Sequence, residues 1–249
     1  MKRQMKKKTA ACICAAACGV CILAALIGGR PDGKPSLSEG TNRLQKLSGQ
    51  TVAEVEKKIS ERDAREQKDQ EAWENRTPNE KMANAVLLGD SRAEAFAEYE
   101  ILDQSRVLAK IGIGLNGADS YLDQAIGLNP QYVFLSYGMN DMSSTGGDAE
   151  MFKEQYRAAV RKLKAGLPES SIYINTIMPV QEKAVEKEPI LAHLEEFNTA
   201  IREVCAEEQV TCIETGDLAK EELYEPDGQH FIMDFYPLWF ERMAEAAGL

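Results

Sequence analysis

Five short apolar segments, recurring from residue 84 onward, constrain the fold of this chain more than any other feature. They are 84–89 (NAVLLG), 106–113 (RVLAKIGI), 132–138 (YVFLSYG), 171–178 (SIYINTIM) and 210–215 (VTCIET). Most of them are nearly continuous apolar runs rather than alternating patterns. Strands that are buried on both faces have this composition, and such strands are typical of parallel sheets.

Segments with helical periodicity separate the apolar runs. They lie directly after Ser91 and at about 117–127, 149–166, 190–207 and 235–247. This alternation predicts a parallel five-stranded sheet with helices on both faces, which is a three-layer α/β/α sandwich. The domain is expected to cover residues 83–249, long enough for one hydrophobic core.

Residues 1–29 have the pattern of a membrane anchor. A basic cluster at 2–8 precedes an uncharged run from Thr9 to Gly29. About 20 such residues, at ~1.5 Å each, span the hydrocarbon core of a bilayer. The basic cluster favours a cytoplasmic N-terminus, so the protein is expected in the cell membrane as a single-pass chain with its domain outside. A cleaved signal peptide, which gives a secreted protein, and a lipoprotein signal at Cys18 are the alternatives.

Residues 30–80 are expected to form a charged stalk. It begins with an irregular segment rich in Pro, Gly and Ser. Apolar residues then recur near helical spacing amid many charges, at Leu44, Leu47, Val52, Val55 and Ile59. We interpret this part as a solvated spacer helix, with a short coiled coil as the alternative.

The charge balance argues against nucleic acid as a partner. The chain has 29 basic and 40 acidic residues, whereas binding to phosphate backbones requires an excess of basic residues on a surface. The acidic balance suits a neutral or cationic substrate. It makes no prediction of oligomeric state.

The cysteines give no metal-binding pattern. Four of the six lie within the uncharged N-terminal run, and only Cys205 and Cys212 lie in the domain. No CxxC or Cys/His cluster is present, so we expect no structural metal. In an oxidising compartment Cys205 and Cys212 are candidates for pairing, which their spacing alone does not establish.

Polar residues follow the first three predicted strands. They are Asp90 and Ser91 after the first, the glycine-rich segment 112–117 after the second, and Asn140 with Asp141 after the third. Because parallel strands end at the same edge of a sheet, these residues are expected to share one rim. Ser91, at the start of a helix, is a candidate helix cap and also a candidate nucleophile.

A serine nucleophile needs a base, and the chain offers two histidines. His193 lies on a charged helix and is expected at the surface. His230 follows Asp227 by three residues, so a turn can bring the carboxylate to the imidazole, although Asp-Gly is also an ordinary turn. Candidate donors to an oxyanion are the N–H of Ser91, the N–H of a glycine after the second strand, and the amide of Asn140, whose alternative role is a turn or cap.

The motifs LLGDSRAE, YGMND and DGQHF, together with the closing segment DFYPLWFERMAEAAG, resemble the SGNH hydrolases, also called the GDSL esterase and lipase family. This resemblance implies a flavodoxin-like fold and no cofactor or metal. It makes Ser91 the nucleophile, His230 the general base, Asp227 the residue that orients the base, and Asn140 an oxyanion donor. Gly114 is the best match for the glycine donor, and Gly112 is the second.

Two residues depart from the family pattern. Arg92 replaces the leucine of the GDSL signature, and we expect no loss of catalysis from it. Met139 replaces a residue that is often small, so the pocket wall is expected to differ.

The resemblance implies a serine esterase. With an anchor and a stalk, it favours short-chain esters, such as O-acetyl groups on cell-wall or other polysaccharides, as substrates. A lipase or lysophospholipase, an O-acyltransferase and a non-catalytic glycan-binding module on the same fold are the rival interpretations.

Overall fold

The computed structural model describes residues 51–249 of the 249-residue chain, and this part divides into two units between Gln70 and Glu71. The predicted membrane anchor at 1–29 and the first part of the predicted stalk lie outside the described residues. Among residues 51–249, no helix has both the length and the apolar composition needed to cross a membrane.

Helix α3, Val52–Glu74, occupies the second part of the predicted stalk. Val55 and Ile59 are 39% and 46% exposed. The ion pairs Lys57–Glu61 and Arg62–Glu66, each four residues apart, lie along its surface. These are the features of a solvated helix, which the sequence predicts for this segment. The role of α3 as part of a stalk stays a prediction.

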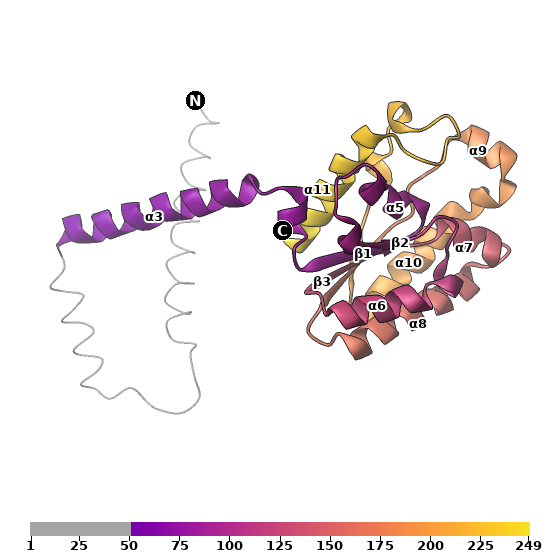
Figure 1. Cartoon of the computed structure of the whole chain (residues 1–249), viewed down its shortest axis with the longest axis horizontal. Coiled ribbons are helices and arrows are strands. Elements are labelled where there is room, and N and C mark those ends of the chain that lie inside the picture. Colours follow the sequence, from indigo (N-terminus) through magenta and orange to yellow (C-terminus); the bar gives the residue numbers. More distant parts are fainter. Residues whose placement is uncertain (1–50) are drawn as a thin grey trace, which may run out of the picture. The chain divides into compact units, whose positions relative to one another are not determined.

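The second unit is built on a five-stranded sheet in which all neighbouring strands are parallel, in the order β2-β1-β3-β4-β5 (Figure 1). The strands are β1 Ala85–Gly89, β2 Val107–Ala109, β3 Tyr132–Ser136, β4 Ser171–Asn175 and β5 Thr211–Ile213. This strand order is that of the flavodoxin-like fold. The predicted parallel five-stranded sheet is therefore confirmed.

Helices cover both faces of the sheet. Figure 1 shows α6 and α8 on one side and α5 and α11 on the other. The α-helices after α3 are α4 Pro78–Lys81, α5 Ser91–Glu98, α6 Asp119–Leu128, α7 Met139–Ser144, α8 Ala149–Gly166, α9 Glu182–Lys187, α10 Leu194–Glu208 and α11 Tyr236–Ala247. Short 3-10 helices lie at Gln104–Arg106, Leu115–Gly117, Pro189–His193, Gly216–Leu218, Glu221–Leu223 and Met233–Phe235. The predicted three-layer α/β/α sandwich is confirmed.

The burial of β1 explains its continuous apolar sequence. Val86 and Leu88 belong to the core cluster on the side of α6, α8 and α10, whereas Ala85 and Leu87 belong to the cluster on the side of α5 and α11. Successive side chains of a strand point to opposite faces, so a strand covered on both sides needs apolar residues at every position.

Several predicted elements differ in extent, and β3, β4 and β5 are each shorter than predicted. The predicted strand 106–113 is a strand only at Val107–Ala109, since the chain then turns through Gly112, whose φ is +75°. The predicted helix 190–207 begins as the 3-10 turn Pro189–His193 and becomes α-helical at Leu194.

Aromatic packing holds α11 against the sheet. Trp239 is fully buried, and its ring centroid lies 5.0 Å from that of Phe96 in α5. Its Nε1 donates a hydrogen bond of 3.0 Å to Oδ1 of Asn175. Helix α11, which begins at Tyr236, therefore packs close to the point where the segment with His230 ends.

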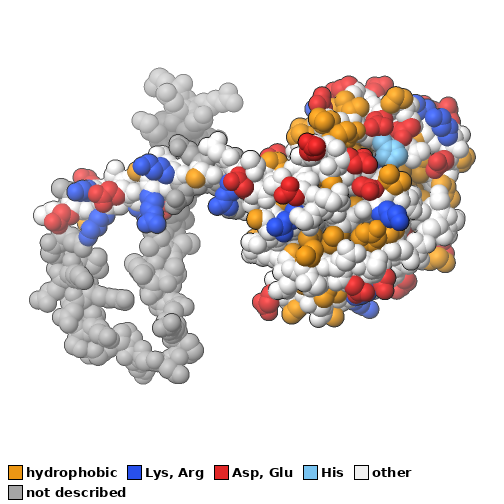
Figure 2. Space-filling model, viewed as in Figure 1, with side chains coloured by type: hydrophobic (Ala, Val, Ile, Leu, Met, Phe, Trp, Pro, Cys, Tyr) orange, Lys and Arg blue, Asp and Glu red, His pale blue; other side chains and the backbone are white. Residues whose placement is uncertain are grey.

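The surface carries charges of both signs. Figure 2 shows acidic and basic side chains scattered among apolar ones over the visible face, without a continuous basic patch there. Cys205 and Cys212 are free thiols, the first buried and the second half-buried.

Candidate active site

The turn from β1 to α5 is tight because Gly89 has no side chain. A Cβ at residue 89 would lie 2.5 Å from Cβ of Ala93 and 2.6 Å from the carbonyl oxygen of Ser136. Real Cβ atoms are not found this close to other atoms. Glycine at the end of β1 therefore lets α5 begin at the rim of the sheet, with Ser91 as its first residue.

Asp90, rather than Ser91, caps α5. Its side chain accepts a hydrogen bond of 3.0 Å from the N–H of Arg92, and Asp90 is only 2% exposed. A carboxylate at this position is a strong helix cap. The interpretation of Ser91 as the cap is corrected accordingly, since Asp90 performs that role and leaves the serine hydroxyl available.

The Ser91 hydroxyl is paired with the base predicted for it. Oγ of Ser91 lies 3.0 Å from Nε2 of His230, although the two residues are 139 positions apart in the chain. On the other side of the imidazole, Nδ1 lies 2.6 Å from Oδ2 of Asp227. The three side chains therefore form a continuous series of hydrogen bonds, which is the geometry of a Ser-His-Asp triad.

The Asp227 side chain is held by its own loop. Its Oδ1 accepts hydrogen bonds from the backbone N–H groups of Gln229 at 2.8 Å and His230 at 3.0 Å. Burial by itself raises the pKa of this carboxyl, but the hydrogen bonds from the His230 side chain and from these two N–H groups lower the pKa to about 2. Asp227 is therefore ionised near neutral pH.

An ionised Asp227 determines which ring nitrogen of His230 carries the proton. A carboxylate only accepts hydrogen bonds, so Nδ1 of His230 must be the donor in the 2.6 Å contact. In the neutral imidazole this leaves Nε2 as an acceptor, facing the hydroxyl of Ser91. The arrangement is that of a base ready to receive the serine proton.

A pocket of about 200 Å³ opens beside Ser91 and His230. Gly112 and Asn140 both contribute to its lining. Asn140 lies in the first turn of α7, and its Nδ2 donates to the carbonyl oxygen of Ile113 at 3.0 Å. The structure thus brings together Ser91, His230, Asn140 and one of the two glycines matched to the family pattern.

Gly114 has a different environment. It is not among the described residues that line the pocket, and a Cβ at this position would lie 2.7 Å from Oδ1 of Asp141. Asp141 is fully buried, and its Oδ1 accepts from the N–H of Leu115 at 2.8 Å. Glycine is therefore required at position 114 because the backbone packs too closely against the Asp141 side chain to leave room for a Cβ.

His193 lies at the surface, as the sequence predicts. Its side chain is 42% exposed and contacts Glu196, with Nδ1 and Oε2 3.1 Å apart. Among the described residues, no group of three or more His, Cys, Asp or Glu side chains is arranged to hold a metal ion.

Sequence patterns did not predict several of the residues that line the pocket. Glu188 and Leu191 come from the connection between β4 and α10, where no recognisable motif lies. Met139, whose departure from the family pattern predicted an altered pocket wall, does line the pocket. Arg92 also lines it, and its replacement of leucine in the signature was the signal that could have indicated a role.

Comparisons with solved structures agree with this fold. A GDSL-like lipase of Bacteroides thetaiotaomicron is similar with a TM-score of 0.54 and 14% identity, over 74% of this chain and 96% of that one. A putative GDSL-like lipase of Parabacteroides merdae has a TM-score of 0.54 at 16% identity, over 66% and 96% of the two chains. An acetylxylan esterase of Geobacillus stearothermophilus has a TM-score of 0.51 at 12% identity, over 66% and 94%.

A comparison with curated protein sequences finds no significant match. The model of the GDSL-like Lipase/Acylhydrolase family, however, matches residues 87–236, which include Ser91, Asn140, Asp227 and His230. Since this match spans more than half of the chain, the protein belongs to the GDSL-like lipase/acylhydrolase family and is an ester-hydrolysing enzyme.

Proposed function

We propose that this enzyme hydrolyses short-chain esters, with O-acetyl groups on carbohydrates as the favoured class, through an acyl-enzyme formed on Ser91. The observation that carries the proposal is the hydrogen-bonded series Ser91–His230–Asp227 at the edge of a small pocket. Each step of the reaction can be assigned to one of these groups.

In the first half of the reaction, Oγ of Ser91 bonds to the carbonyl carbon of the ester while Nε2 of His230 accepts the hydroxyl proton. Ionised Asp227 stabilises the imidazolium that results. The tetrahedral intermediate then expels the alcohol, which takes the proton back from His230. In the second half, His230 takes a proton from a water molecule while the water oxygen attacks the acyl carbon. The second tetrahedral intermediate then breaks its bond to Oγ of Ser91, which takes the proton back from His230, and the acid is released.

The negative charge that develops on the carbonyl oxygen in the tetrahedral intermediate is stabilised by hydrogen-bond donors that are already in place before the reaction. In this proposal they are the N–H of Ser91 at the start of α5, the amide of Asn140 and the N–H of a glycine. Of the two matching glycines, Gly112 is favoured, because it shares the pocket lining with Ser91 and Asn140 whereas Gly114 packs against Asp141.

The size of the pocket supports a short acyl group. Its volume of about 200 Å³ is below the 300–1,000 Å³ that is common for sites of drug-sized ligands. Glu188, Ser143 and Gln229 add polar groups to its lining, next to the apolar side chains of Leu191 and Met139. A small pocket of mixed polarity favours an acetyl group over a long chain.

A second pocket supports a polar alcohol as the other half of the ester. It measures about 460 Å³ and is lined mainly by polar side chains, including Gln181, Lys183 and Glu221. It adjoins the loop of the triad, since a Cβ at Gly228 would lie 2.6 Å from Cε of Lys183. Hydroxyl-rich sugars suit such a surface, and the structural similarity to an acetylxylan esterase supports the same class.

Location is part of the proposal. The basic cluster and uncharged run within residues 1–29 support an anchor in the cell membrane, with the catalytic domain on the outer side. There the enzyme would meet acetylated cell-surface glycans. A secreted enzyme, produced by cleavage of the same segment, is the alternative.

One observation favours a lipid esterase as the second candidate. Ile111, in the pocket lining, is 65% exposed, and an apolar side chain in this position can contact an acyl chain. The two candidates differ in the dependence of rate on chain length.

The experiment compares p-nitrophenyl esters of increasing chain length with acetylated xylan and a lysophospholipid. The proposal expects the highest kcat/KM for acetate and release of acetate from xylan. Preference for long chains and cleavage of the lysophospholipid would support the lipid esterase instead. No acetate release from any glycan, with acyl transfer to added sugars, would support an O-acyltransferase.

Catalysis by Ser91 is tested with S91A and H230A, and H193A serves as the matched histidine control. S91A and H230A are expected to lose ester hydrolysis, and S91A also loses labelling by a fluorophosphonate, whereas H193A retains both. A folded wild-type protein that neither labels nor hydrolyses any ester would identify a non-catalytic binding module.

A further inference from the structure

Arg92 is buried beside the candidate nucleophile. It is only 3% exposed although it carries a guanidinium. Its Nε and Nη2 donate to the carbonyl oxygen of Gln229 at 3.0 and 2.7 Å, and its Nη1 donates to the carbonyl oxygen of Met178 at 3.0 Å. Burying a charged group is costly unless it is paired or hydrogen-bonded, and these three hydrogen bonds offset part of that cost.

The two carbonyl groups belong to segments that are distant in the sequence. Gln229 lies between Asp227 and His230, in the loop of the triad, whereas Met178 follows the end of β4. Arg92 itself is the residue after Ser91. One side chain therefore connects the helix start that carries the nucleophile, the loop that carries the base and the rim of the sheet.

We propose, on the basis of the proposed function, that Arg92 is a positioning residue that fixes the His230 loop relative to Ser91 through the carbonyl of Gln229. It does not touch the reacting atoms in this role. It holds the Nε2 nitrogen of His230 at hydrogen-bond distance from the serine hydroxyl.

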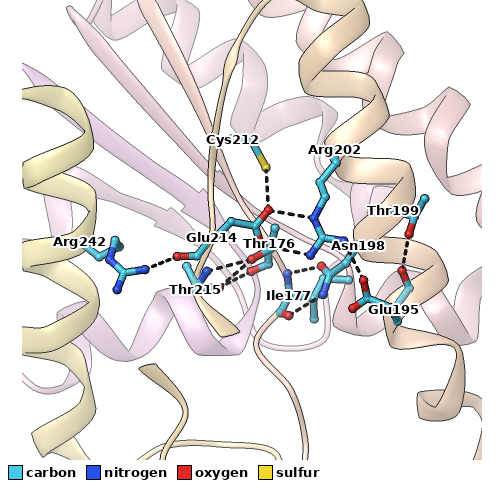
Figure 3. A network of polar contacts seen from close by, with 10 residues as sticks. All are labelled: Thr176, Ile177, Glu195, Asn198, Thr199, Arg202, Cys212, Glu214, Thr215 and Arg242. Carbon is cyan, nitrogen blue, oxygen red and sulfur yellow. Dashed lines mark hydrogen bonds and ion pairs between the residues drawn. The ribbon is translucent and has the colours of Figure 1, made fainter. Parts of the chain in front are cut away.

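The attachment point at β4 is itself rigid. Asn198 of α10 holds Ile177, the neighbour of Met178, by accepting from its N–H at 2.7 Å and donating to its carbonyl at 3.0 Å. Thr215 donates to the carbonyl of Thr176 at 2.7 Å. Figure 3 shows these contacts together, with Asn198 and Thr215 reaching the end of β4 from different elements. Arg92 thus connects the loop to the segment directly after β4, which these hydrogen bonds hold.

The chemistry of the side chain fits this role. Arginine offers five N–H donors in a rigid planar arrangement and keeps its charge under all ordinary conditions. The ring of Phe231, the residue after His230, lies 5.3 Å from Cζ of Arg92 and gives a cation–π contact to the same loop. Leucine at residue 92 would make none of these polar contacts.

The test uses R92L and R92K in the full chain, with R242L as the matched control. Arg242 also holds a backbone carbonyl, that of Glu214, but it does so through contacts that include none of the triad residues. The measurements are kcat and KM for p-nitrophenyl acetate, the rate of labelling by a fluorophosphonate, thermal unfolding, and the low-field proton resonance of the Asp227–His230 hydrogen bond.

For R92L we expect kcat and the labelling rate to fall by about 10²-fold, with little change in KM, because small misplacements of reacting groups have effects of this size. The low-field resonance should broaden or disappear. R92K, which keeps the charge but has one nitrogen donor group, should recover part of kcat. R242L should keep the wild-type kcat, labelling rate and resonance.

If R92L folds, a wild-type kcat and an unchanged resonance in this variant would overturn the inference. If R92L does not fold, a wild-type kcat, labelling rate and resonance in R92K would overturn it. A wild-type protein without esterase activity would instead contradict the proposed function. In that case the low-field resonance alone still decides whether Arg92 holds the loop.

Discussion

Asp227 and His230 are three residues apart and form a 2.6 Å hydrogen bond between Oδ2 and Nδ1, closed by a loop that also satisfies the second carboxylate oxygen. The acid and the base of the candidate triad are thus one local unit. The nucleophile, by contrast, comes from the other end of the domain.

Replacing Asp227 by Asn should keep the loop but stabilise the wrong tautomer of His230, because an amide can donate to Nδ1. We expect kcat to fall by about 10²–10⁴-fold with a modest change in KM. Steady-state kinetics with p-nitrophenyl acetate would measure it. A folded D227N with wild-type kcat would show that this carboxylate has no part in catalysis.

The pKa of Asp227 also predicts how acid affects folding. Because its native pKa is lowered to about 2, below the ordinary value of 3.8, its contribution to stability is fully present above about pH 4 and is lost as the pH falls through 2. Acid unfolding curves of wild type and D227N should therefore converge below about pH 4. Curves that stay parallel through this range would contradict the assignment.

Asn140 should contribute to catalysis more than to binding. Removing one oxyanion donor typically lowers kcat by about 10²–10³-fold. We expect a loss of this size in N140A, with a small change in KM. If KM rises while kcat is unchanged, the amide binds the ground state of the substrate instead.

Replacing each of the two glycines after β2 by alanine should have different effects on stability and on kcat. A methyl group at residue 114 would collide with the Asp141 carboxylate, so G114A should unfold at a lower temperature. At residue 112 there is open space, and the cost of roughly 1–2 kcal/mol comes from its φ of +75°. G112A should lose kcat out of proportion to its stability, and an equal loss of kcat in folded G114A would favour Gly114 as the donor.

Asp141 should make stability depend on pH between about pH 4 and 6. Burial raises its pKa to about 6, so the native state binds more protons than the unfolded state between about pH 4 and 6. Stability from this group therefore falls as the pH rises through that window. Asn at this position keeps an acceptor for the N–H of Leu115 without the charge.

Urea unfolding of D141N and wild type at pH 4 and pH 7 measures this effect. The variant should gain on the order of 2 kcal/mol relative to wild type between the two pH values. Exposed Asp234→Asn is the control and should show no such gain. A constant difference between D141N and wild type would mean that Asp141 does not titrate in this range.

The fold could be predicted because β1, β3 and β4 are buried on both faces, which forces an apolar residue at nearly every position. The strand ends were less predictable, since the departure of the chain from β2 depends on the φ of Gly112 rather than on hydrophobicity. In the site, Ser91 and His230 could be paired because the chain offers few histidines. Asp90 caps α5 through a local contact with the N–H of Arg92, and the sequence offered both Asp90 and Ser91 before this helix. The side-chain contacts of Arg92, by contrast, join segments that are distant in the sequence.

From the sequence we expect only that Arg92, in place of leucine, causes no loss of catalysis, and this stays a prediction. The hydrogen bonds of Arg92 to Gln229 and Met178, 137 and 86 positions away, could not be predicted from the motif around Ser91.

The distance of 139 positions between Ser91 and His230 also has a consequence for biosynthesis. A ribosome makes the nucleophile early and its base late, shortly before α11, which packs against the domain through Trp239. A partly synthesised chain therefore carries the serine without the group that activates it. In the proposed mechanism the serine gains its base only after synthesis has passed residue 230 and this segment has folded against Ser91, so a shorter nascent chain lacks the complete triad.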